Sequence, residues 1–271
     1  MTAQTKQRTK LLLFDLDGTL LQDDKTISQR TLGALEKCRG EGVLIGVATS
    51  RSEENCMTFL QRLQPDVLIS SGGALVKYLG SIIYRDVFSE EETARMIAAA
   101  RSVCGEGCEI TIDTQEGHFW NYKTDPLKWD PSWGGSIYTD YRDFSHRSLK
   151  MCVEIFDAGQ AERLKELLPD CDCVRFSDGE WYKFTRKTAT KEQAIRRLCE
   201  ASGMAVDEIA AFGDDHVDIG MLKLCGLGIA MEKAVREVKE AADLVIGSNQ
   251  EDGIARYLEG LDARDEKLKE F

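Results

Sequence analysis

The sequence predicts an α/β protein in which a doubly wound, parallel-sheet domain is interrupted by an inserted α+β domain. Short, continuously apolar runs alternate with helix signals in the first and last thirds of the chain, as in a parallel sheet with helices on both faces. In the middle third, the strands alternate polar and apolar residues, and all four Trp residues of the chain lie there. Such a shift in composition and pattern marks a separate domain.

The first third contains three predicted strands joined by two helices. The apolar runs at residues 11–14, 43–48 and 67–69 are typical of buried parallel strands. Ser28 and Ser52 each precede a helical pattern, where a serine hydroxyl can cap the first turn. The order strand, helix, strand, helix, strand predicts neighbouring parallel strands.

The last third repeats this alternation. A helix is predicted at residues 191–201, and strands follow at 209–212, 228–230 and 244–246. We therefore expect the two ends of the chain to build one sheet around the inserted domain.

The middle third has the pattern of strands with one packed and one open face. Leu, Met, Val and Ile at positions 149, 151, 153 and 155 point one way, and Lys150 and Glu154 point the other. If helices cover the apolar face, the polar face looks toward the core domain. The predicted boundaries are 1–85 and 187–271 for the core domain and 86–186 for the inserted domain.

Composition and charge argue against several classes of function. The chain has 35 Lys and Arg against 47 Asp and Glu, a formal net charge of −12, which disfavours nucleic-acid binding through a general basic surface. No apolar run near the start approaches the length of a membrane span. The nine Cys are scattered, and Cys171 and Cys173 are too close together for a zinc knuckle. We expect a soluble, cytoplasmic monomer or homodimer with no nucleic-acid or membrane partner.

Carboxylates and a hydroxyl follow the predicted core strands at the point where each strand ends. Asp15 and Asp17 follow the first strand, Thr49 ends the second, and Asp214 and Asp218 follow the strand at 209–212. Because ligands of an open parallel sheet bind at the carboxyl ends of its strands, these side chains are expected to converge.

Crowded carboxylates require a cation, and oxygen ligands without His or Cys favour Mg²⁺. One alternative is that these acids are only turn formers and helix caps, but that reading weakens when every acidic turn falls at the same sheet edge. A calcium loop starting at Asp15 is a second alternative. It fails, because Leu20 stands where such a loop needs Gly and Thr26 where it needs Glu.

Four motifs, taken in order, resemble those of the haloacid dehalogenase-type phosphohydrolases. The match is closest to the Cof-like branch, whose cap domain is inserted between the second and third motifs. The motifs are Asp15-Leu16-Asp17-Gly18-Thr19, Thr49, Lys191 and Gly213-Asp214-Asp215-xx-Asp218. The resemblance covers the chain except its first ten residues and its tail. It implies a Rossmann-like core domain, a cap domain and hinges near residues 84–88 and 185–188.

The resemblance also implies a set of catalytic roles. Asp15 would attack phosphorus and form an aspartyl-phosphate. Asp17 would protonate the leaving oxygen and then take a proton from the hydrolytic water. Thr49 and Lys191 would hold phosphoryl oxygens as charge redistributes in the transition state.

In the same resemblance, Mg²⁺ would be held by Asp15, the carbonyl of Asp17 and Asp214, and Asp218 would orient the metal's outer ligands or Lys191. The metal would screen the anionic nucleophile from the anionic phosphate.

Substrate contacts are expected from both domains. In the core domain the candidates are Thr49, Ser50, Arg51 and Lys191, with a surface position as the alternative for Arg51. His216 is expected to be a solvated loop residue. In the cap domain the candidates for the leaving group are Lys150, Glu154, Arg175, Trp120 and Tyr122. For the two aromatic residues, the alternative is packing within the cap domain or a contact on the hinge side.

Three positions depart from the family pattern. Gly72, Val217 and the pair Glu232-Lys233 stand where the family usually has Asn or Gly-Asn. Each change removes a side-chain amide near the phosphate or the loops around it, and Lys233 is a candidate replacement cation.

The sequence as a whole therefore predicts a Mg²⁺-dependent phosphatase for a small phosphorylated metabolite, with sugar phosphates as the leading class. The alternatives are a phosphomutase or phosphotransferase, in which a second substrate accepts the phosphoryl group, and a non-catalytic binding protein.

Overall fold

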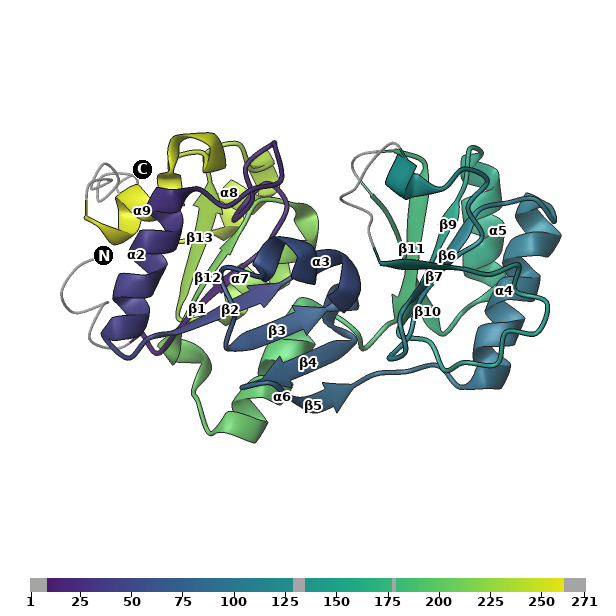
Figure 1. Ribbon diagram of the computed structural model, residues 1–271, viewed down its shortest axis with the longest axis horizontal. Helices are drawn as coiled ribbons and strands as arrows, with labels where there is room; N and C mark the ends of the chain where they lie inside the picture. Colours follow the sequence, from purple (N-terminus) through teal and green to yellow (C-terminus); the bar gives the residue numbers. More distant parts are fainter. Residues whose placement is uncertain (1–8, 129–134, 177–178, 261–271) are drawn as a thin grey trace.

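The computed structural model describes residues 9–128, 135–176 and 179–260, and these form two lobes, each built around one β-sheet (Figure 1). The two ends of the chain build the larger lobe, and the middle of the chain builds the other. This arrangement confirms the predicted fold class, a doubly wound core with an inserted α+β cap domain.

The core sheet has eight strands in the order β14-β13-β12-β1-β2-β3-β4-β5. Their bounds are β1 (Leu11–Phe14), β2 (Leu44–Ala48), β3 (Val67–Ser70), β4 (Leu75–Tyr78), β5 (Ser81–Arg85), β12 (Ile209–Gly213), β13 (Leu227–Met231) and β14 (Leu244–Ile246). The six predicted strands are present and pair in parallel, whereas β4 and β5 form an antiparallel hairpin at one edge that the sequence analysis did not predict.

Helices cover both faces of the core sheet. They are α2 (Gln29–Gly40), α3 (Glu53–Leu60), α6 (Lys191–Ser202), α7 (Ile219–Leu224), α8 (Arg236–Ala241) and α9 (Gly253–Leu258). Alternate residues of β1 enter separate apolar clusters, Leu12 with α2, α3 and α9, and Leu13 with α6, α7 and α8. Burying a Leu side chain contributes about 1.5–3 kcal/mol, so both layers hold the sheet. Ser28 and Ser52 cap α2 and α3, as predicted.

The cap sheet has six strands in the order β10-β11-β9-β6-β7-β8. Its elements are α4 (Glu90–Cys104), β6 (Ile110–Asp113), β7 (His118–Trp120), β8 (Ser136–Tyr138), β9 (Lys150–Glu154), α5 (Ala158–Leu167), β10 (Cys171–Arg175) and β11 (Trp181–Arg186). Met151, Val153 and Ile155 pack in one cluster with apolar residues of α4 and α5, as the alternating pattern predicts. Leu149 differs, because it packs against Ala74 of the core domain and marks the cap–core junction.

Two connections join the lobes, one after β5 and one after β11. The predicted hinge segments include the ends of these strands, since Tyr84 and Arg85 belong to β5 and Thr185 and Arg186 belong to β11, and their role as hinges stays a prediction. Arg186 ties the connections together: its guanidinium donates to the Val87 carbonyl at 3.0 Å. The boundaries at residues 85 and 186 stay a prediction.

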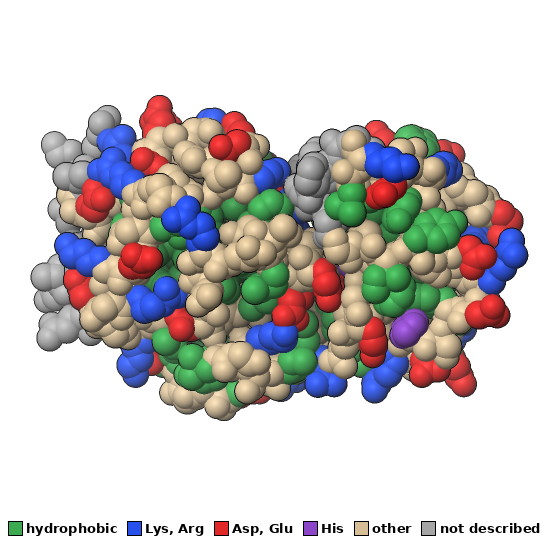
Figure 2. All heavy atoms as spheres, viewed as in Figure 1, with side chains coloured by type: hydrophobic (Ala, Val, Ile, Leu, Met, Phe, Trp, Pro, Cys, Tyr) green, Lys and Arg blue, Asp and Glu red, His purple; other side chains and the backbone are tan. Residues whose placement is uncertain are grey.

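Charged side chains of both signs are interspersed over the face seen in Figure 2. All nine cysteines are free thiols, in keeping with the sequence analysis. Within the ranges that the structure describes, no helix is both long enough and apolar enough to span a membrane.

Candidate active site

Three carboxylates gather at the carboxyl ends of β1 and β12. One oxygen from each of Asp15, Asp214 and Asp218 lies within 4.8 Å of the others. Lys191, the first residue of α6, donates to Asp15 at 2.5 Å and to Asp218 at 2.7 Å. The sequence thus places four of its predicted site residues in one cluster.

A glycine makes this cluster possible. Gly18 follows Asp17 with a positive φ of 81°, and a Cβ on it would lie 2.3 Å from Oδ2 of Asp214. The next residue, Thr19, donates from its hydroxyl to Asp214 at 2.6 Å. The turn after β1 therefore approaches the turn after β12 closely because position 18 has no side chain.

The cluster carries an excess of negative charge. Burial raises the pKa of Asp15 well above its usual range, and the neighbouring Asp218 and Asp214 add to this against the opposing effect of Lys191. Burial also raises the pKa of Asp214 to about 6. Burial alone would lower the pKa of Lys191, but Asp15 and Asp218 outweigh it and raise that pKa.

Three carboxylates facing a single ammonium leave two negative charges to be balanced. Hard carboxylate oxygens at these separations suit a divalent cation such as Mg²⁺. The donor set therefore fits the predicted metal.

Asp218 accepts hydrogen bonds both from Lys191 and from the backbone of the loop after β12. Its second oxygen accepts from the backbone N–H groups of Asp214 and Asp215, at 3.0 and 3.1 Å. The side chain is fully buried, so these bonds fix both the loop after β12 and the Lys191 ammonium.

Asp17 is not a member of the acidic cluster and pairs instead with two cations. Arg51 donates to its two oxygens at 2.6 and 2.9 Å, and Lys25 donates to one of them at 2.7 Å. Burial would raise the pKa of Asp17, but hydrogen bonds and charge from Arg51 and Lys25 outweigh it, and the pKa is lowered.

Arg51 is therefore not a surface residue, the alternative that the sequence left open. Its side chain is only 12% exposed and pairs with Asp17. Thr49, two residues earlier, is buried and accepts the Arg51 N–H at its hydroxyl oxygen at 3.1 Å. The second motif thus supplies both a buried hydroxyl and a largely buried guanidinium.

A cavity of about 950 Å³ lies between the two domains. The predicted residues of the core domain that line it are Asp15, Asp17, Thr49, Ser50, Arg51 and Asp214. Lys191 is not on its wall: the side chain is 2% exposed and lies against Asp15. The nucleophile candidate therefore separates the Lys191 ammonium from the open cavity.

Most of the predicted cap candidates line this cavity, and the two cations among them have different ion-pair partners. Lys150 is committed to structure, because its ammonium donates to Asp113 at 2.8 Å and to the Ser50 carbonyl of the core domain at 2.7 Å. Arg175 lines the cavity and pairs with Glu180.

Of the two aromatic candidates, only Trp120 lines the cavity. Trp120 lines the cavity and packs edge-to-face with Trp181, their ring centres 5.7 Å apart. Tyr122 is not among the lining residues and packs between Trp120 and Tyr138. Glu154 lines the same wall of the cavity as the two tryptophans.

The positions that depart from the family pattern lie in different surroundings. Val217 lines the cavity, as does the exposed His216. Lys233 is exposed and is not among the lining residues, so it is badly placed as a replacement cation. Gly72 lies in the turn after β3, and the side chain of Lys183 covers it.

The sequence analysis missed several polar residues of this cavity. His118 lines the cavity, and it pairs with Asp113, which is buried behind the wall at the end of β6. Asp113 also accepts from Lys150 and from the hydroxyl of Ser71 of the core domain, each at 2.8 Å. Lys183 and Trp181 of β11 also line the cavity. The alternation of β11, with Tyr182 and Phe184 on the other face, was the available signal.

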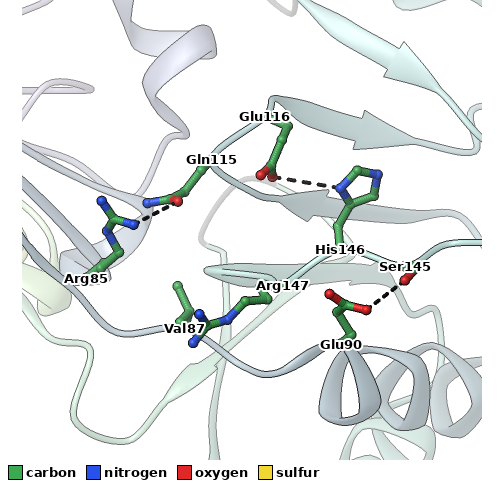
Figure 3. Close-up of a pocket in the computed structure, with 8 residues that line it drawn as sticks. All are labelled: Arg85, Val87, Glu90, Gln115, Glu116, Ser145, His146 and Arg147. Atoms are coloured by element: carbon green, nitrogen blue, oxygen red, sulfur yellow. Dashed lines mark hydrogen bonds and ion pairs between the residues drawn. The ribbon is translucent and has the colours of Figure 1, made fainter.

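A second, smaller cavity of about 140 Å³ lies where the first connection meets the cap domain (Figure 3). Its polar groups largely satisfy one another: Arg85 donates to Gln115 and Ser145 donates to Glu90. It contains none of the predicted site residues.

A doubly wound core, an inserted cap domain and a buried Asp–Lys cluster between them define the class of phosphoryl-transfer hydrolases. A family model for haloacid dehalogenase-like hydrolases matches residues 12–258. The chain belongs to this family, in its Cof-like branch, and is a phosphoric monoester hydrolase.

Similar proteins are known by sequence and by structure. A candidate phosphatase of Haemophilus influenzae is 28% identical, covering 92% of this chain and 97% of the relative. The 5-amino-6-(5-phospho-D-ribitylamino)uracil phosphatase YcsE of Bacillus subtilis is 27% identical, with coverages of 92% and 94%. The subclass IIB sugar phosphatase BT4131 has a solved structure that aligns with a TM-score of 0.77 at 25% identity, covering 93% of this chain and 98% of that protein.

Proposed function

We propose that this enzyme is a Mg²⁺-dependent phosphatase that hydrolyses a small phosphorylated metabolite through an aspartyl-phosphate on Asp15. The observation that carries the proposal is the placement of Asp15, which lines the cavity and accepts from the buried Lys191 ammonium, which Asp218 holds in turn. A carboxylate fixed in this way is oriented for attack on a phosphate in the cavity.

In the first step, an oxygen of Asp15 bonds to phosphorus as the bond from phosphorus to the leaving oxygen breaks. Asp17 gives its proton to that oxygen. In the second step, water attacks the aspartyl-phosphate, Asp17 takes the proton of the water, and Asp15 is released with inorganic phosphate.

The side chains around Asp15 support these steps. Thr49 would hold a phosphoryl oxygen in the cavity, and Lys191, which donates to Asp15 from behind, would keep that carboxylate in place. Mg²⁺ would be held by Asp15, Asp214 and the carbonyl of Asp17, with Asp218 orienting its surroundings, and when bound it supplies positive charge between nucleophile and phosphate.

Asp17 has to change partners before it can donate a proton. Its ion pairs with Arg51 and Lys25 favour the deprotonated form. A phosphate that draws Arg51 toward its own oxygens would release Asp17 and raise the pKa of that carboxyl. In this proposal, Arg51 and Ser50 contribute to substrate binding as well as to the resting arrangement.

Sugar phosphates are the first substrate class to test. A phosphorylated polyol that carries a flat, amine-bearing ring is a second candidate, because Trp120 and Trp181 offer an aromatic wall and Glu154 lies in the same cavity. The relative YcsE is named for a substrate of this type.

The test is phosphate release from an aryl phosphate, with and without Mg²⁺, by wild type, Asp15→Asn and the exposed control Asp23→Asn. We expect metal-dependent release by wild type and by Asp23→Asn, and none by Asp15→Asn. Release that is unchanged in Asp15→Asn overturns the proposal. If folded wild type released no phosphate from the aryl phosphate or from sugar phosphates, the binding-protein alternative would be favoured.

The acceptor is tested in water enriched in ¹⁸O. A phosphatase incorporates one ¹⁸O atom into each inorganic phosphate released, because water attacks the aspartyl-phosphate. Transfer to an added sugar without labelled phosphate would instead favour the phosphotransferase alternative.

A further inference from the structure

Lys183 is the cation on the cavity wall that the proposed mechanism leaves without a task. It is the third residue of β11, it is 5% exposed, and it lines the cavity. Its neighbours in the pairing of the strands are Cys152 on β9 and Val174 on β10, and both also line the cavity. The ammonium therefore lies in a cross-strand row whose adjacent members are uncharged.

The other cations that line the cavity have acidic partners. Arg51 pairs with Asp17, Lys150 with Asp113 and Arg175 with Glu180. For Lys183, the described part of the chain supplies neither an ion pair nor a hydrogen bond. Leaving a buried ammonium without an acid is costly, so such a group calls for an anion from outside the protein.

The position of the ammonium relates it to the phosphate site. A Cβ built on Gly72 would lie 3.1 Å from Nζ of Lys183, so the end of this side chain lies against the bare backbone of Gly72. The Gly72 N–H in turn donates to the carbonyl of Thr49 at 3.0 Å. Lys183 therefore reaches from the cap domain to the turn after β3, and the backbone of that turn is hydrogen-bonded to Thr49.

Nearby charges agree with this reading. Burial and the Lys150 ammonium lower the pKa of Lys183 to about 8, with a further lowering by Lys191 and opposing effects of Cys152 and Asp172. Because Lys150 and Lys191 already have acidic partners, Lys183 is the cation among the three that an anion in the cavity could neutralise.

We propose that Lys183 is a substrate-binding residue whose ammonium binds an oxyanion of the substrate beside Gly72. This inference rests on the proposed phosphatase function. The oxyanion has two possible sources, the phosphoryl group itself or a second acidic group on the leaving group, and both share the chemistry of an anionic oxygen accepting from an ammonium.

The test compares Lys183→Met with wild type and with Lys165→Met, which makes the same change at an exposed position of α5. Phenyl phosphate and 4-carboxyphenyl phosphate serve as a matched pair of esters, and binding of inorganic phosphate is measured by calorimetry. In Lys183→Met we expect KM to rise by about tenfold to hundredfold while kcat changes by less than about threefold. Lys165→Met should behave like wild type.

The pattern of the losses identifies the source of the oxyanion. If Lys183 binds the phosphoryl group, both esters and inorganic phosphate bind more weakly. If it binds a second acid, only 4-carboxyphenyl phosphate loses affinity.

An unchanged KM for both esters together with unchanged phosphate binding would overturn the inference. Thermal melting of Lys183→Met distinguishes binding from a purely structural role of Lys183. If the side chain serves packing, the variant has a lower Tm than wild type, whereas removal of an unpaired buried charge raises Tm. If the phosphatase proposal itself is wrong, wild type turns over neither ester, and this result differs from every result above.

Discussion

At the scale of single residues, ion pairs between acidic and basic side chains fix the arrangement of the site. Asp15, Asp214 and Asp218 share one ammonium, and Asp17 is held by Arg51 and Lys25. The sequence motifs predict which residues converge, because each stands at the end of an apolar strand. They do not predict that Asp17 pairs with Arg51, because that contact depends on side-chain directions set 34 residues apart.

The acidic cluster makes metal binding sensitive to pH. Between about pH 4 and 6 the folded protein binds more protons than the unfolded chain at Asp214, because the pKa of this carboxyl is raised to about 6. Without metal, this group therefore favours folding at low pH, and its contribution is lost as pH rises through 6.

Added Mg²⁺ should therefore raise Tm at pH 7.5, and the rise should shrink as pH falls below about 6. Differential scanning fluorimetry with and without Mg²⁺ across this range measures it. In Asp214→Asn the response to Mg²⁺ should be strongly reduced at every pH. A Tm that is indifferent to Mg²⁺ at pH 7.5 in wild type would contradict this prediction.

Lys183 should lower stability while it aids binding. Its pKa is depressed to about 8, so above pH 8 the unfolded chain binds more protons than the folded protein, and stability rises with pH until the unfolded pKa near about 10.4. At pH 7, Lys183→Met should increase the free energy of unfolding by roughly 2–3 kcal/mol. Urea unfolding of wild type and Lys183→Met at pH 7 and at pH 10 measures this increase. The difference in the free energy of unfolding between the two proteins should be smaller at pH 10.

At the scale of elements, the apolar strands were the most predictable part of the fold. Four-residue runs such as 11–14 are buried on both faces, so their pattern needs no knowledge of partners. The hairpin of β4 and β5 escaped prediction because Ser81–Arg85 is half-exposed at the sheet edge and mixes polar with apolar residues. The alternating strand β9 was predicted correctly, including the face that lines the cavity.

The strand pair β6 and β9 joins the cap domain to the core domain through Asp113 and Lys150. Asp113 accepts from the Ser71 hydroxyl, and Lys150 donates to the Ser50 carbonyl. Burial would raise the pKa of Asp113, but Lys150 and His118 outweigh it and lower the pKa. The charged form of Asp113 thus stabilises the folded protein above the unfolded pKa of about 3.9, and this contribution is lost as pH falls through the folded pKa.

Lys150→Met should destabilise the protein by about 3–5 kcal/mol, because it leaves Asp113 buried without its main counter-charge. Chemical denaturation at pH 7 measures the loss, and Lys165→Met provides the exposed control. The double variant Lys150→Met/Asp113→Asn should recover part of the lost stability. Equal stability of Lys150→Met and wild type would show that this pair does not hold the domains together.

At the scale of the whole molecule, the chain places the proposed nucleophile, Asp15, at the edge of the core sheet and covers it with a separate domain. The core domain supplies the acids, Lys191 and the second motif, and the cap domain supplies Lys183, Trp120 and Trp181. The sequence predicts this division, since motifs and insertion are both visible in it. It does not predict the wall of the cavity, because that depends on which cap residues face the core domain once the domains meet.

The central claim is that Asp15 carries the phosphoryl group. It is tested most directly by mixing enzyme, Mg²⁺ and an aryl phosphate, quenching in acid within milliseconds, and locating the added phosphate by peptide mass spectrometry. We predict a phosphate on the peptide that contains Asp15, which is removed by hydroxylamine and absent from Asp15→Asn. Turnover without a phosphorylated Asp15 under these conditions, or a phosphate at another residue, would contradict the account.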